Sequence, residues 1–93
     1  MAKGSIRNQM SDDDLLRALE ALAGTLGVEL RYEKGDFKGG LCRLQGRSVF
    51  FLQEDDPVDE KIRTLAACLG ELDLENVYVF PAVRELIDEI RNL

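Results

Sequence analysis

Apolar residues recur at helical spacing near the start of the chain. One helix face with i, i+3, i+4 and i+7 spacing is formed by Leu15, Ala18, Leu19, Leu22 and Leu26. Ser11 and three aspartates come just before this face. A serine N-cap and acidic residues in the first turn both stabilise the start of a helix. Gly27 is a typical stop signal. The sequence therefore predicts an amphipathic helix between Ser11 and Gly27.

The pattern changes to strict alternation after Gly27. Residues 28–33 alternate apolar and polar side chains, which is typical of a half-buried strand. Residues 41–45 and 48–53 are two further strand-like segments, and Gly46-Arg47 between them fits a two-residue turn with glycine first. This order predicts a three-stranded antiparallel β-meander. The side chains expected to face the helices are Val28, Leu30, Tyr32, Leu44, Val49 and Phe51 or its neighbour.

Helical spacing returns in the second half of the chain. Asp56 as N-cap and Pro57 at the first helical position predict a helix over residues 57–72. Its apolar face consists of Val58, Ile62, Leu65, Leu69 and Leu72. Residues 73–76 interrupt the pattern, and Pro81 can open a last helix with an apolar stripe at Leu86, Ile87 and Ile90.

These elements predict an α+β fold: a helix, the three-stranded antiparallel β-meander, a helix, a short link and a C-terminal helix. A chain of 93 residues makes one domain, which we place at residues 11–93 after a flexible N-terminus at residues 1–10. No apolar run resembles a signal peptide or a membrane span. Two cysteines are few for a secreted domain of this size. We therefore expect a cytoplasmic protein whose thiols are reduced.

Composition excludes several kinds of chemistry. The chain has no histidine, which removes histidine-based acid/base catalysis and the common histidine-ligated metal sites. The acidic run Glu54, Asp55, Asp56, Asp59 and Glu60 lacks the glycine and ligand spacing of a calcium loop, so helix capping explains it better. We expect no cofactor and no metal on this basis.

Charge is distributed unevenly along the chain. The formal net charge is −6, yet residues 27–52 hold five basic and three acidic groups. The acidic balance disfavours nucleic-acid binding, because such binders need positive charge. A less favoured hypothesis is an anion or nucleic-acid binder that uses Arg31, Lys38, Arg43 and Arg47. A basic sheet could also meet the acidic helices of a second copy or of another protein.

The segment Arg63-Thr64-Leu65-Ala66-Ala67-Cys68-Leu69-Gly70-Glu71-Leu72 resembles the active-site helix of the ImmA/IrrE family of bacterial zinc metallopeptidases. That family shows a stretch of the type R-x-T-L-A-H-E-L-G-H-L, in which two histidines bind zinc and a glutamate acts as general base. Here Ala67, Cys68 and Glu71 occupy those three positions. The resemblance implies a non-catalytic relative with a vestigial site, and it would account for Gly70 within the predicted helix.

Two functional hypotheses follow from the remaining residues. The first is a protein-interaction or dimerisation module with zincin-like ancestry. For the apolar residues of the C-terminal stretch we favour a place in the core, because a chain of this length has a limited core. If the stretch instead carries an interface, it would lie at Tyr78, Phe80, Val83 and Arg84. The alternative is a metal- or thiol-dependent enzyme that uses Cys68 and Glu71. We favour the first, without a membrane or nucleic acid as partner.

Overall fold

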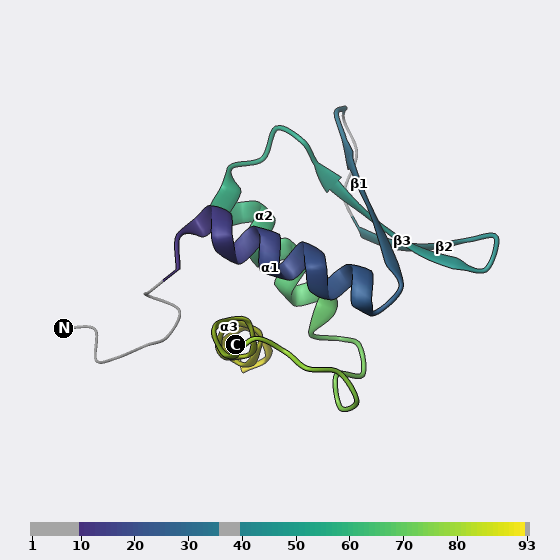
Figure 1. The fold of residues 1–93 in the computed structure, drawn as a ribbon. Coiled ribbons are helices and arrows are strands. Elements are labelled where there is room, and N and C mark those ends of the chain that lie inside the picture. Colours follow the sequence, from purple (N-terminus) through teal and green to yellow (C-terminus); the bar gives the residue numbers. More distant parts are fainter. Residues whose placement is uncertain (1–9, 36–39, 93) are drawn as a thin grey trace.

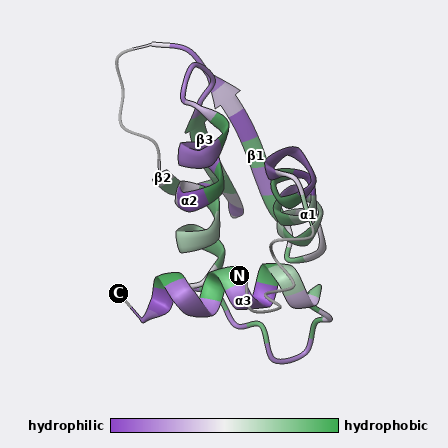
Figure 2. Ribbon diagram, turned by 90° about the vertical axis from the view of Figure 1, so that its left-hand side faces the viewer, coloured by the Kyte–Doolittle hydropathy of each residue, from purple (hydrophilic) through white to green (hydrophobic). Residues whose placement is uncertain are grey.

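The computed structural model describes residues 10–35 and 40–92. Over these residues the fold is α+β, with three helices and a three-stranded mixed sheet. The elements in chain order are α1 (Asp12–Thr25), β1 (Val28–Glu33), β2 (Gly40–Leu44), β3 (Arg47–Gln53), α2 (Val58–Leu69) and α3 (Pro81–Arg91). Helices α1 and α2 lie side by side next to the sheet (Figure 1), and α3 crosses below them (Figure 2).

The helix boundaries follow local signals, with one shift at α2. The Ser11 hydroxyl accepts a hydrogen bond from the Asp14 amide at 3.1 Å, and Gly27 takes a positive φ of 80° just after α1. At α2 the prediction of Asp56 as N-cap is wrong by one residue. Pro57 is the N-cap instead, because its carbonyl accepts from the Lys61 amide at 3.0 Å and no side chain caps the helix.

The predicted antiparallel meander is wrong in its topology. The strand order is β1-β3-β2, with β3 in the centre, parallel to β1 and antiparallel to β2. Glu33 pairs with Gln53 and Gly40 pairs with Phe51, so the link between β1 and β2 joins the two sides of β3. A link of six residues can span the roughly 10 Å between strands on either side of a third. The link is therefore long enough to place β2 on the far side of β3 from β1.

The hairpin turn lies one residue earlier than predicted. Gln45 and Gly46 form it, with φ values of 51° and 80°, and β2 and β3 flank them directly. Positive φ at both central residues is the signature of a type I′ turn, whose twist matches that of the strands. Glycine adopts this conformation at no steric cost, and it stands at the second central position rather than the first.

Register decides which strand residues face the helices. Phe50 pairs with Leu30, and Leu52 pairs with Tyr32. Both belong to the core cluster with α1 and α2. Because side chains alternate along a strand, Leu44, Val49 and Phe51 lie on the opposite face. This corrects the prediction for Leu44 and Val49, whereas at Phe51 the predicted alternative holds, because its neighbours Phe50 and Leu52 face the core. Val28, Leu30 and Tyr32 take their predicted places at or against the core.

The core sits between the sheet and all three helices. Its fully buried side chains include Leu19 of α1, Leu52 of β3, Leu65 and Leu69 of α2, and Val83 and Ile87 of α3. Helix α2 ends at Leu69, so Leu72 of the predicted helix lies beyond it. Met10, predicted to be flexible, packs partly buried against this cluster, and residues 1–9 lie outside the described residues. No helix in residues 10–35 and 40–92 is long and apolar enough to cross a membrane.

Candidate functional site

A cavity lies where α1 meets α3 and the link before it. It has a volume of about 450 Å³, and most of its lining is apolar. Its lining residues are Met10, Asp14, Ala18, Ala21, Leu22, Thr25, Tyr78, Phe80 and Val83. We call it the α1–α3 groove. The small side chains of Ala18 and Ala21 leave the space, and Tyr78 and Phe80 form the opposite side.

The two aromatic residues of this groove are unusually exposed. Tyr78 is 78% exposed and Phe80 is 49% exposed, whereas Val83 is 1% exposed beside them. Phe80 is the residue before Pro81, and its carbonyl accepts the first helical hydrogen bond of α3, from the Arg84 amide at 2.9 Å. The start of α3 therefore fixes the backbone that carries these aromatics. Large exposed apolar side chains that line a groove are typical of binding surfaces.

The structure brings together three of the four residues predicted for the interface. Tyr78, Phe80 and Val83 line the α1–α3 groove. Arg84 is not among its lining residues; it borders a more polar depression with Asp73, Glu75 and Arg91. The sequence pattern missed the α1 side of the groove, because Ala18 and Ala21 carry no local sign of what they will face.

The suspected vestigial site forms a second, smaller depression. Ala67, Cys68 and Glu71 line it with Thr64 of α2, and Gly40, Leu41 and Phe50 of the sheet complete it. Its volume is about 280 Å³. Ala67 and Glu71 are exposed, whereas Cys68 is only 8% exposed. The three positions that the sequence singled out therefore do lie together, facing strand β2.

The electrostatics of this depression disfavour a reactive thiol. Burial and, to a lesser extent, the neighbouring Glu71 carboxylate raise the pKa of the Cys68 thiol to about 11. A nucleophilic cysteine needs a lowered pKa, because the thiolate is the reactive form. Among residues 10–35 and 40–92, no three Cys, Asp or Glu side chains are grouped so that they could hold a metal ion.

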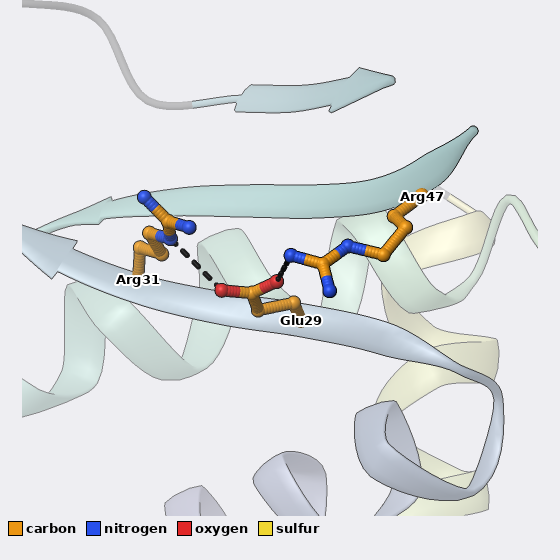
Figure 3. A network of polar contacts seen from close by, with 3 residues as sticks. All are labelled: Glu29, Arg31 and Arg47. Carbon is orange, nitrogen blue, oxygen red and sulfur yellow. Dashed lines mark hydrogen bonds and ion pairs between the residues drawn. The ribbon is translucent and has the colours of Figure 1, made fainter. Parts of the chain in front are cut away.

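The basic residues of the sheet do not form one patch. Arg31 and Arg47 both bond to Glu29, with nitrogen–oxygen distances of 2.9 Å and 3.0 Å (Figure 3). The hydrogen bond from Arg31, with the nearby charges of both arginines, lowers the pKa of Glu29. By strand alternation Arg43 lies on the other face of the sheet, and Lys38 lies outside the described residues. The network partly neutralises the charge on which anion binding would depend.

Strand β2 adds an exposed surface that the sequence pattern did not single out. Leu41 is 42% exposed, Leu44 is 44% exposed, and Cys42 between them is exposed. A strand at a sheet edge offers unpaired backbone groups to another chain. Its edge position follows from the β1-β3-β2 order, which no local signal in the sequence reveals.

Comparisons with protein-family models, with curated proteins and with solved structures find no match to this chain.

Proposed function

We propose that this chain is a non-catalytic protein-interaction module of zincin-like ancestry, and that it binds its partner in the α1–α3 groove. The observation that carries the proposal is the pair of exposed aromatics, Tyr78 and Phe80, beside an apolar cavity of about 450 Å³. Exposed aromatic anchors next to an apolar pocket are the usual centre of a protein interface. The ancestry rests on the sequence resemblance alone.

The groove also indicates the chemistry of its partner. Most of its lining is apolar, which favours an apolar segment as occupant. Asp14 lines one end, and Asp12 and Asp13 precede it in the first turn of α1. An acidic rim beside an apolar cavity favours a segment in which basic residues flank apolar anchors. An amphipathic helix laid into the groove would satisfy both requirements.

The depression at Ala67, Cys68 and Glu71 supports catalysis less well than the groove supports binding. The nucleophile that the sequence singled out there is a thiol whose pKa is raised to about 11 by burial and by Glu71. That thiol is protonated at neutral pH and largely shielded from solvent. These properties are typical of a cysteine that packs rather than one that reacts.

Site-specific photo-crosslinking in cells tests the proposal. A photoreactive phenylalanine analogue replaces Tyr78 in the full chain, and a second sample carries the analogue at Leu44 as a control. We expect position 78 to capture a protein through an apolar segment with basic flanks, and we expect Phe80→Ser to abolish that product. Capture of the same proteins from both positions, or product that survives Phe80→Ser, would overturn the proposal.

A further inference from the structure

The outer edge of β2 has no neighbour among the residues that the structure describes. In the order β1-β3-β2 this five-residue strand is an edge strand, and its turn end projects beyond the helices (Figure 1). Proteins usually protect such edges with proline, bulges or several charges. Strand β2 has the sequence Gly-Leu-Cys-Arg-Leu, with one charge and none of the other devices.

The hairpin register fixes which backbone groups point outward. A type I′ turn closes with a hydrogen bond between its two flanking residues, which here are Leu44 and Arg47. Hydrogen-bonded and non-hydrogen-bonded pairs alternate along an antiparallel ladder. Leu44, Cys42 and Gly40 therefore direct their backbone groups toward β3, while Leu41 and Arg43 direct theirs toward the open edge.

We propose that a second copy of this chain pairs antiparallel along β2, about a two-fold axis at Cys42, to form one continuous sheet across the two copies. In this register Leu41 stands opposite Arg43 of the second copy, and the reverse pair forms on the other side of the axis. Both residues of each pair direct their backbone groups outward, so each pair can exchange two hydrogen bonds. This edge of β2 is separate from the α1–α3 groove.

Side-chain shape on the open face of the sheet favours this register. Gly40 stands opposite Leu44 of the second copy, and a Cβ added at Gly40 would meet no atom within 4 Å. Phe51 lies beside Gly40 in the sheet and is half-buried. The exposed Leu44 of one copy would therefore fill open space next to Phe51 of the other. A larger side chain packed over an edge glycine is a known way to stabilise paired strands.

Charge on the helix-facing side also favours a second copy. Leu41 borders the same depression as Glu71 of α2. Arg43 of the second copy stands directly opposite Leu41, and opposed side chains lie on the same face of a sheet. Arg43 of the second copy therefore lies on the helix-facing side, where Glu71 is. Two-fold symmetry repeats this Arg43–Glu71 pairing. The alternative register centred on Arg43 would instead place two arginines opposite each other, which destabilises a strand pair.

Sedimentation of the full chain over a range of concentrations, under reducing conditions, tests the proposal. One short strand from each copy makes a small interface, so we expect a reversible, concentration-dependent dimer. Arg43→Glu should weaken the dimer by about tenfold or more, since it faces Glu71 with a like charge twice. The double variant Arg43→Glu with Glu71→Arg should restore much of the affinity.

A crosslink at the axis gives an independent readout. Opposed residues of a non-hydrogen-bonded pair have Cα atoms about 4.5 Å apart, within the range for a disulfide. Diamide, which accepts the two electrons and two protons released by two thiols, should join Cys42 to Cys42 of the second copy. Cys42→Ser should abolish the covalent dimer.

Each contrary outcome overturns the dimer in a distinct way. A monomer at all concentrations refutes it, as does a dimer that is insensitive to Arg43→Glu. A dimer that is lost in Phe80→Ser but retained in Arg43→Glu would place the contact in the groove instead. Diamide crosslinks between Cys42 and a different protein would show that the edge binds a foreign strand. The effect of Arg43→Glu on the dimer does not bear on the groove proposal.

Discussion

The reactivity of Cys68 separates a packing cysteine from a catalytic one. The pKa of its thiol is raised from an ordinary value of 9.0 to about 11, first by burial and then by Glu71. A rise of about two units lowers the thiolate fraction at neutral pH by about a hundredfold. A more basic thiolate is intrinsically more nucleophilic, which recovers about a factor of ten. The pKa alone therefore predicts alkylation about tenfold slower than that of an ordinary thiol.

Burial slows this reaction further. Cys68 is 8% exposed, so its reaction with a reagent requires a transient local opening of the packing around α2. Cys42, which is exposed on β2, provides a matched thiol in the same chain. We therefore expect the ratio of the Cys42 rate to the Cys68 rate to exceed tenfold in the folded protein and to fall toward one in denaturant.

The assay is iodoacetamide labelling at pH 7.5, followed by mass spectrometry of the two cysteine peptides at successive times. The variants Cys42→Ser and Cys68→Ser assign each rate without competition between the thiols. Labelling at low protein concentration keeps Cys42 free of any contact with a second copy. If Cys68 reacted as fast as Cys42 in the folded protein, the reasoning would be refuted, and a thiol-dependent activity would have to be sought.

Two further predictions concern stability. Gly70 is the C-cap of α2, and a Cβ added there would stand 3.2 Å from the Ala66 carbonyl oxygen and from Ile87 Cγ2. Gly70→Ala should therefore lower the free energy of unfolding, measured by urea denaturation, by about 1 kcal/mol. Gly24→Ala, in open space within α1, should not destabilise, and equal effects at both sites would contradict the packing argument. The second prediction concerns stability at high pH. Burial, and then the hydrogen bond to Glu20, raise the pKa of Tyr32 above its ordinary value of 10.0. The pKa of Cys68 is raised from 9.0 to about 11. Because the folded state then holds these protons more tightly than the unfolded state, stability should fall as pH rises from about 9 through 11. In the double variant Tyr32→Phe with Cys68→Ala, the free energy of unfolding should depend less steeply on pH between about 9 and 11. An unchanged pH dependence would contradict the role of these two groups.

The helices were predictable because their signals are local. The Ser11 cap, the stop at Gly27 and Pro81 at the start of α3 each act within one turn of the chain. The spacing of apolar residues then shows which helix face is buried. The end of α2 was placed too late, because Leu72 continues the apolar spacing although the helix ends at Leu69.

The sheet topology could not be obtained in the same way. Alternation at Val28–Glu33 shows a strand and its faces but not its neighbour. Consecutive strands usually pair, and that tendency led to the meander. At β3 the run Val49-Phe50-Phe51-Leu52 is apolar throughout, so alternation cannot decide its inward face. Only the pairing with β1 and β2 does so.

Only the part of the candidate site that lies within one segment of the sequence could be predicted. Tyr78 and Phe80 stood out as more apolar side chains than a small helix face needs, and the structure leaves both exposed. The opposite side of the groove comes from α1, which is distant in sequence. The open edge of β2 depends on topology, so the sequence did not mark Leu41 as exposed, and Leu44 was predicted to face the helices.

A binding titration tests most directly whether the α1–α3 groove is the binding surface. Its ligand is a synthetic peptide with the sequence of the partner segment that is crosslinked from position 78. Isothermal calorimetry would compare the unmodified chain with Phe80→Ser and Arg43→Glu. We expect Phe80→Ser to weaken binding by about tenfold or more, as loss of an aromatic anchor does, and Arg43→Glu to leave the affinity unchanged. Equal affinity of the unmodified chain and Phe80→Ser would contradict the claim that the α1–α3 groove is the binding surface.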